Sequence, residues 1–95
     1  MRSYELVLIV RGDWDEEKAA AIVEKVTGLI TAQGGTIENL DKWGKRRLAY
    51  LIDDQQDGFY TVVNFKGVPA VEQELDRVLR ITDGVIRFLV VRPNE

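Results

Sequence analysis

The chain has 95 residues and a mass of 10.8 kDa, with 45% apolar and 31% charged residues. This length accommodates one domain with a single modest core, so we expect residues 1–95 to form one domain. The sequence contains neither cysteine nor histidine. Disulfides, zinc–thiolate sites, cysteine nucleophiles and the usual general base at neutral pH are therefore excluded. We predict that the protein is not an enzyme, with no cofactor, no metal site and no small-molecule substrate.

The charge balance is thirteen basic against sixteen acidic residues, a net charge of −3. Diffuse electrostatic attraction to nucleic acid is therefore not a property that we expect of the molecule as a whole. No apolar run approaches the roughly 20 residues that span a bilayer. The opening residues, Met1–Glu5, lack the charged-then-apolar pattern of a signal peptide. We therefore expect a cytoplasmic protein without membrane contact.

The first predicted element is a strand from Tyr4 to Val10, which is short, apolar and rich in β-branched residues. Glu5 is the only charged residue in this strand. Alternation from Glu5 places Val7 and Ile9 on the same outward face. The other face, with Tyr4 at its start, is predicted to line the core.

A helix is predicted to follow this strand. Asp13 and Glu16 resemble a capping box at its beginning, and the pair Gly34-Gly35 is expected to end it. Apolar residues between these points recur at helical spacing and form one stripe. The stripe consists of Ala19, Ile22, Val23, Val26, Leu29 and Ile30.

Two extended segments follow, and we expect them to form a hairpin. The first runs from about Thr36 to Ile52 and is irregular around residues 41–44. The second is the strand Phe59 to Phe65, and the polar residues 53–58 form the turn between the two.

The last two elements are a helix and a strand. The helix is predicted to open at Gly67-Val68-Pro69, because proline costs least in the first turn, and to end at Asp83-Gly84. The strand runs from Val85 to Val91, and Arg87 marks its outward face.

The order strand–helix–strand–strand–helix–strand is typical of the split βαβ arrangement of ferredoxin-like α+β folds. It predicts a four-stranded antiparallel sheet with both helices on one face and the first strand between the third and the fourth. The predicted core consists of Leu6, Leu8, Ile22, Val26, Leu75, Leu79, Phe88 and Val90.

The densest basic feature is Lys45-Arg46-Arg47, which runs directly into Leu48-Ala49-Tyr50. Lysine and arginine supply phosphate contacts, and a nearby tyrosine can stack on an unpaired base. Charges on an exposed strand also prevent sheets from pairing edge to edge. The residues alone leave both interpretations open. Alternation is expected to place Tyr50 under the helices and Lys45 and Arg47 on the open face.

The open face of the predicted sheet carries a second feature. Val7, Ile9, Leu89 and Val91 all point outward if Glu5 and Arg87 do, and they come from strands that this fold places side by side. Aliphatic residues that cluster on an uncovered sheet indicate a protein-binding patch. Scattered surface apolar residues without a function are the alternative. The third strand has apolar residues in both registers, so its outward face stays open.

The run from Gly44 to Ile52, GKRRLAYLI, resembles a known family, bacterial small-subunit ribosomal protein six. That family carries a glycine, an arbitrary residue, two basic or polar residues, Leu-Ala-Tyr, a variable residue and isoleucine. The likeness covers nearly the whole chain. It includes the opening Met1–Glu5, the aromatic pair after Gly58, and the run from Leu79 to Arg87.

The resemblance implies a ferredoxin-like fold and a structural role in translation. It implies binding to the central domain of 16S ribosomal RNA, jointly with small-subunit ribosomal protein eighteen. Tyr50 is implied to be structural, whereas the implied RNA contacts are Arg2, Lys45, Arg46, Arg47 and Arg87. We expect the partner protein to dock on the face of Val7, Ile9, Leu89 and Val91.

Two residues depart from the family pattern. Leu51 replaces a proline of many members, and Asp53 stands where a basic or small residue is usual. The net charge of −3 agrees with the joint mode of binding, because a protein with few cations to neutralise phosphates needs a basic co-binder.

Two alternatives share the predicted fold. One is a protein-interaction or ligand-sensing module without RNA binding, which would dimerise through the aliphatic face. The other is a small hydrolase such as an acylphosphatase, which needs a phosphate loop with an arginine after the first strand and a catalytic asparagine. Arg11-Gly12 is the only trace of that loop, and Asn64 lies within a strand without a matching motif.

Overall fold

The structure is a computed structural model, which describes residues 1–52 and 55–93, apart from the side chain of residue 51. The side chain of Leu51 and the whole of Asp53, the two positions at which the sequence departs from the family pattern, therefore lie outside the described part of the chain. The elements are β1 (Arg2–Arg11), α1 (Glu16–Ala32), β2 (Thr36–Ile52), β3 (Gln55–Gly67), α2 (Pro69–Arg80) and β4 (Val85–Val91).

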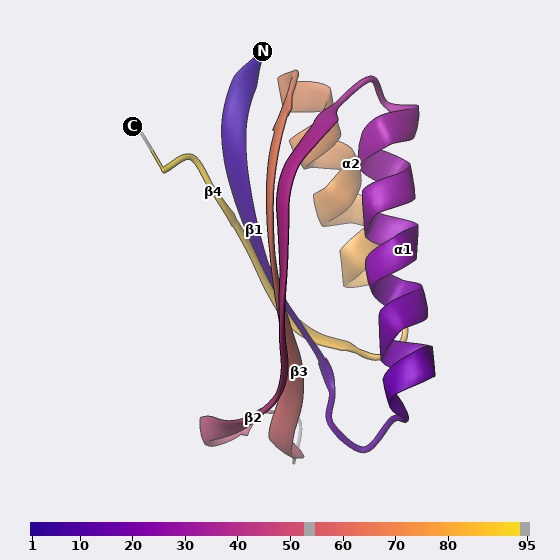
Figure 1. Ribbon diagram of the computed structural model, residues 1–95, viewed down its shortest axis with the longest axis vertical. Coiled ribbons are helices and arrows are strands. Elements are labelled where there is room, and N and C mark those ends of the chain that lie inside the picture. Colours follow the sequence, from indigo (N-terminus) through magenta and orange to yellow (C-terminus); the bar gives the residue numbers. More distant parts are fainter. Residues whose placement is uncertain (53–54, 94–95) are drawn as a thin grey trace.

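The strands form one sheet in the order β2-β3-β1-β4, and every neighbouring pair is antiparallel. Both helices lie on the same face of this sheet (Figure 1). The predicted ferredoxin-like α+β fold is confirmed, and so is the position of the first strand between the third and the fourth. Among the described residues, no helix is long and apolar enough to cross a membrane.

The core lies between the helices and the face of β1 that carries Tyr4, Leu6, Leu8 and Val10, all of them buried. The aromatic ring of Tyr4 stacks on that of Phe65 in β3, with 5.2 Å between ring centroids. Of the predicted core, Leu6, Leu8, Val26, Leu75 and Leu79 are buried. Ile22, Phe88 and Val90 are partly buried and pack against that cluster.

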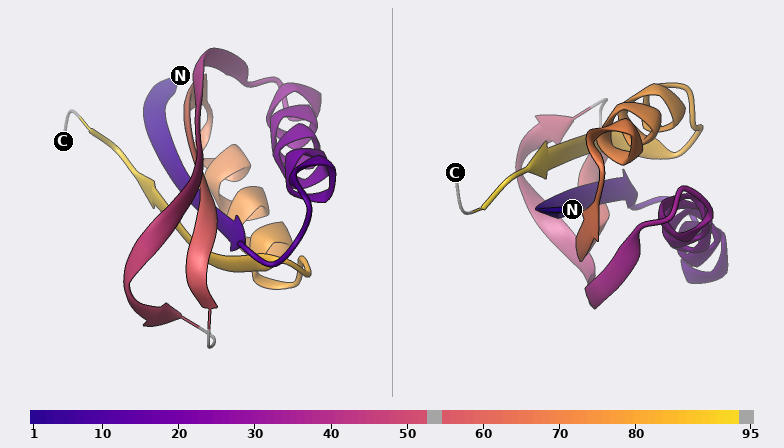
Figure 2. Two further views of the ribbon diagram at one scale, coloured as in Figure 1. Left: turned by 60° about the horizontal axis from the view of Figure 1, so that its bottom comes forward. Right: turned by 90° about the horizontal axis from the view of Figure 1, so that it is seen from above.

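The hairpin of β2 and β3 is longer than predicted and is not regular. Its register shifts between Ile37 and Asn39, between Lys42 and Gly44, and between Arg47 and Ile52. Gly44 has φ +79°, a left-handed conformation that suits glycine. The predicted irregularity around residues 41–44 is thus a β-bulge. Figure 2 shows the outer end of the hairpin bending away from the helices.

The beginning of α1 differs from the prediction. The N-cap is Asp15, whose carboxylate accepts a hydrogen bond from the backbone N–H of Lys18 at 2.7 Å. Asp13 forms an ion pair with Arg11 instead, at 2.8 Å. This hydrogen-bonded pair lowers the pKa of the Asp13 carboxyl below its ordinary value. The prediction of a capping box at Asp13 was wrong because Asp13 and Asp15 can both cap the helix. Asp15, which directly precedes Glu16, occupies the N-cap position.

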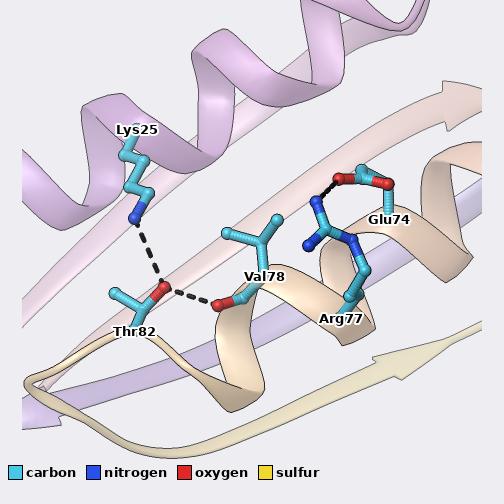
Figure 3. Close-up of polar contacts among 5 residues, drawn as sticks. All are labelled: Lys25, Glu74, Arg77, Val78 and Thr82. Carbon is cyan, nitrogen blue, oxygen red and sulfur yellow. Dashed lines mark hydrogen bonds and ion pairs between the residues drawn. The ribbon is translucent and has the colours of Figure 1, made fainter.

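The C-terminal turn of α2 is tied to α1 by side chains (Figure 3). The ammonium of Lys25 donates a hydrogen bond to the Thr82 hydroxyl at 3.5 Å, and that hydroxyl donates to the carbonyl of Val78 at 2.6 Å. Within α2, Arg77 donates a hydrogen bond to Glu74, which lowers the pKa of that carboxyl below its ordinary value. One of these contacts, between Lys25 and Thr82, joins α1 to the segment after α2, and the pair of Arg77 and Glu74 lies within α2.

The helical side of the core yields a stability prediction. Truncation of Leu75 to alanine should lower the free energy of unfolding by about 2–5 kcal/mol, because the leucine is fully buried and leaves a cavity. Chemical denaturation measures this change. The exposed Gln73→Ala on the same helix is the control, with a change expected within about 0.5 kcal/mol. Equal stability of Leu75→Ala and wild type would contradict the assigned face of α2.

Candidate functional site

The face of the sheet opposite the helices is the open face. β1 presents Glu5, Val7 and Ile9 on it, since the intervening residues enter the core. Tyr60 lies opposite Ile9 in β3, and Arg87 lies opposite Ile9 in β4. The register of β3, which the sequence left open, is therefore fixed: Tyr60, Val62 and Asn64 belong to the open face.

The predicted aliphatic patch is only partly exposed. Leu89 is 54% exposed and Val91 is also exposed, whereas Val7 is half-buried. Ile9 is buried, with 6% of its surface exposed, so the expectation that it lies open to solvent was wrong. A Cβ atom added at Gly58 would lie 2.4 Å from the Ile9 side chain, which shows how closely the hairpin backbone approaches it.

The end of β2 covers Ile9. Leu48 is buried, and residues 48–52 bend over the open face, as the views in Figures 1 and 2 show. The Tyr50 hydroxyl accepts a hydrogen bond from Arg87 Nη1 at 3.0 Å, although β2 and β4 form opposite edges of the sheet. Between this arm and the sheet lies an apolar hollow of about 300 Å³, lined by residues that include Val7, Ile9 and Leu89.

Tyr50 therefore does not pack under the helices. Its side chain reaches Arg87 on the open face and is 64% exposed, so that prediction was wrong. The expected positions of Lys45 and Arg47 on the open face were also wrong. Lys45 lies opposite Phe59, which faces the core with Val10, and its ammonium is 5.3 Å from the Phe59 ring centroid.

The physical causes of these errors are the bulge at Trp43 and Gly44 and, for Tyr50, also the register shift between Arg47 and Ile52. Side chains alternate with a period of two, so a slip of one residue moves every later side chain to the other face. Lys42 lies opposite Thr61, and Gly44 already lies opposite Tyr60. After the bulge, Arg46 shares the open face, and Lys45 and Arg47 share the other.

The structure does not gather the predicted RNA-binding residues into one cluster. Arg46 and Arg87 lie on the open face, at the same end of the sheet. Lys45 and Arg47 lie on the other face of the edge strand β2. Arg2 lies opposite Gly67, eight positions along β1 from the row of Lys45, which is about 27 Å at strand spacing. All of these cations are exposed.

The sequence did not identify two aromatic residues of the open face as candidate site residues. Trp43 and Tyr60 stack with 6.0 Å between ring centroids and 8° between ring planes, and the Arg46 guanidinium lies 5.8 Å from the Trp43 ring. A tryptophan among charged residues on a predicted edge strand was the available signal. Its pairing with Tyr60 depends on the bulge, which the sequence indicated only as an irregularity.

The structure separates the residues of the hydrolase alternative. Arg11 pairs with Asp13, and the amide of Asn64 donates a hydrogen bond to Glu5 at 3.2 Å. Arg11 lies six positions after Glu5 along β1, which corresponds to about 20 Å. An arginine and an asparagine this far apart do not act on one acyl phosphate. In the described part of the chain, no group of three or more acidic side chains is arranged to hold a metal ion.

The fold and this surface define a class of protein: a ferredoxin-like α+β domain whose open sheet face offers a binding surface. The sequence model of the ribosomal protein S6 family matches residues 3–92. The chain belongs to the ribosomal protein S6 family. This result confirms the resemblance found in the sequence.

Individual relatives agree with this assignment. A small ribosomal subunit protein bS6 of Moorella thermoacetica is 52% identical over 100% of this chain and 97% of its own length. The bS6 protein of Symbiobacterium thermophilum is 53% identical over 100% of both chains. A crystal structure of 30S ribosomal protein S6 from Thermotoga maritima has a TM-score of 0.91 and 33% identity, covering 96% of this chain and 86% of that chain.

Membership of this family has two consequences. The family is one of ribosomal proteins, which are structural, and not one of enzymes. Its relatives are small-subunit proteins, in agreement with the expected location, the ribosome of the cytoplasm.

The bulge yields a stability prediction with an internal control. Alanine at Gly44 should lower the free energy of unfolding by roughly 1–2 kcal/mol, because φ +79° brings a Cβ against the backbone. Gly28→Ala is the matched control. Gly28 lies in α1 with open space around it, so alanine should stabilise the protein by about 0.5–1 kcal/mol. Chemical denaturation measures the free energy of unfolding of both variants. Equal changes in the two variants would contradict the left-handed conformation of Gly44 in the bulge.

Proposed function

We propose that this protein binds the central domain of 16S ribosomal RNA jointly with small-subunit ribosomal protein eighteen, as a non-enzymatic constituent of the small subunit. The observation that carries the proposal is the composition of the open face. Exposed aliphatic side chains at Leu89 and Val91 lie on the same face as the cations Arg46 and Arg87. A protein contact and a phosphate contact are thus offered side by side.

The charge of the molecule supports joint binding. The affinity of a protein for RNA grows with the number of phosphates that it neutralises. With a net charge of −3, this protein gains little from long-range attraction. A partner that has already brought the two molecules together lets a few cations act at short range.

The proposal assigns different roles to the predicted residues. Arg46 and Arg87 are proposed to contact RNA across the open face. Lys45 and Arg47 contact phosphates that pass along the outer edge of β2, and Arg2 contacts a separate phosphate near the far end of β1. The partner docks on Leu89 and Val91 and on the hollow that borders Val7 and Ile9.

The docking face is tested by Leu89→Lys. A buried ammonium at the centre of an apolar contact is costly, so capture of ribosomal protein eighteen should fall by at least tenfold, about 1.4 kcal/mol. The fold should persist, because Leu89 is exposed.

Ile81→Lys is the matched control for this experiment. Ile81 is exposed just after α2, away from the open face, and the same change there should leave capture intact. Pull-down with purified partner measures both variants. Equal capture by Leu89→Lys and wild type would move the docking face elsewhere.

The cationic edge is tested by changing Lys45, Arg46 and Arg47 together to alanine. Three neutralised phosphates contribute a slope of roughly −2 to −3 in a plot of log affinity against log salt. The slope of the joint complex with RNA should therefore flatten by about two units. The melting temperature should barely move, since exposed charges contribute little to folding.

Three exposed cations on the helical side provide the charge-matched control: Lys18, Lys25 and Arg77. Their replacement by alanine should leave the salt slope unchanged. RNA titrations at several salt concentrations compare the two triple variants. A slope that responds equally to both, or to neither, would mean that the cations of β2 serve only to protect the edge. A wild-type protein that dimerises and ignores RNA would favour the interaction-module alternative.

A further inference from the structure

We propose that Trp43, with Tyr60 and Arg46, forms a stacking site for an unpaired base of single-stranded RNA. We call these three residues the aromatic platform. This inference rests on the proposed function and deepens it, because it names the place where a nucleobase is held rather than a phosphate.

The indole of Trp43 is exposed yet fixed. It is 46% exposed, although it stacks in parallel on Tyr60. Its ring N–H donates a hydrogen bond to a carboxylate oxygen of Asp41 at 2.9 Å. The backbone at the bulge determines the direction of the side chain, and the hydrogen bond determines the orientation of the ring. A large planar surface is thereby presented to solvent. Because the ring is already fixed, its side chain loses little conformational entropy when a ligand binds.

Arg46 supplies the feature that favours nucleic acid over an apolar partner. Its Nε donates a hydrogen bond to the carbonyl of Trp43 at 3.3 Å, and its guanidinium lies over the indole, 5.8 Å from the ring centroid. A base stacked on the indole is attached to a phosphate within reach of that guanidinium. The carboxylate of Asp41 repels phosphate. We therefore expect the uncharged base to stack on the indole and the attached phosphate to lie on the side of Arg46.

The platform selects unpaired RNA. Stacking on an aromatic side chain tolerates every base, since each has a π-face, but the bases of a duplex are already stacked on one another. Tyr60, Ile9 and Arg87 form one row across three strands, so Arg87 lies about 10 Å from Tyr60 at the spacing of strands. The arm of residues 48–52 covers Ile9 between them, so a short single-stranded segment would reach Arg87 from the platform across the outside of this arm.

The platform borders the proposed docking face at Tyr60, which also lines the hollow, whereas the exposed aliphatic residues lie beyond it. Leu89 lies opposite Val7, and Val91 lies opposite Glu5, so both are further along the sheet than the row of Tyr60. A ligand of the platform and a protein on the aliphatic residues occupy neighbouring but distinct areas.

The experiment measures the affinity of the complex with ribosomal protein eighteen for a central-domain fragment of 16S ribosomal RNA, at several salt concentrations. Trp43→Ala should weaken RNA binding by about five- to a hundredfold, the usual range for the loss of one stacked base. The salt slope should stay unchanged, because no charge is removed. Trp43→Phe keeps an aromatic plane and should retain most of the affinity, whereas Trp43→Leu should behave as alanine does.

Leu40→Ala is the matched control on the same strand. Leu40 is also exposed, and it lies opposite Val63, on the face that does not carry the platform. This variant should bind RNA as the wild type does. Trp43→Leu keeps an apolar side chain but lacks an aromatic plane, and it guards against a loss of folding in the alanine variant.

The outcomes separate this inference from the proposed function. Failure of the wild-type complex to bind the fragment would overturn the proposed function, and the platform with it. Normal binding by Trp43→Ala and Trp43→Leu would overturn the platform alone. Weakened capture of the partner protein by Trp43→Ala in the absence of RNA would make Trp43 a protein contact and also overturn the inference.

Discussion

The bulge at Trp43 and Gly44 is the constraint on which the arrangement of the binding surface depends. It inserts one residue into an edge strand, and the left-handed backbone of Gly44 makes this geometry accessible. The side chains from Lys45 to Arg47 change face as a result. Arg46 consequently lies on the open face, and Lys45 lies beside Phe59 on the other. Without the bulge, Lys45 and Arg47 would share the open face.

A further register shift between Arg47 and Ile52 accompanies a bent hairpin arm. Irregularities of this kind increase the local twist, and the end of β2 crosses the open face until Tyr50 meets Arg87 of the opposite edge. This arm buries Ile9 and leaves Leu89 and Val91 exposed. The open face is thus divided between a covered apolar part, an exposed aliphatic part and a rim with Arg46 and Arg87. A uniform flat sheet would not provide such neighbouring areas of different chemistry.

The fold was predictable from the sequence, whereas the surface was predictable only in part. Alternation in β1 identified the buried face correctly, because no irregularity interrupts the strand between Tyr4 and Ile9. The proline at position 69 and the run Val85 to Val91 located the beginning of α2 and the bounds of β4. In β2 the same argument from alternation failed. A bulge depends on how two strands pair, and one strand's sequence indicates an interruption without stating its direction.

Under the proposed function, protection of the edge and RNA contact by the charges of β2 do not conflict. β2 is an edge of the sheet, and exposed cations on an edge strand disfavour pairing with a second copy. The same exposure is what a phosphate contact requires, since a desolvated cation would already be committed to a partner within the protein. Because consecutive residues of a strand point to opposite faces, Lys45 and Arg46 place charge on both sides of this edge. The two interpretations that the sequence left open are therefore compatible: the cations that disfavour edge-to-edge pairing are the same exposed cations that we propose to contact RNA.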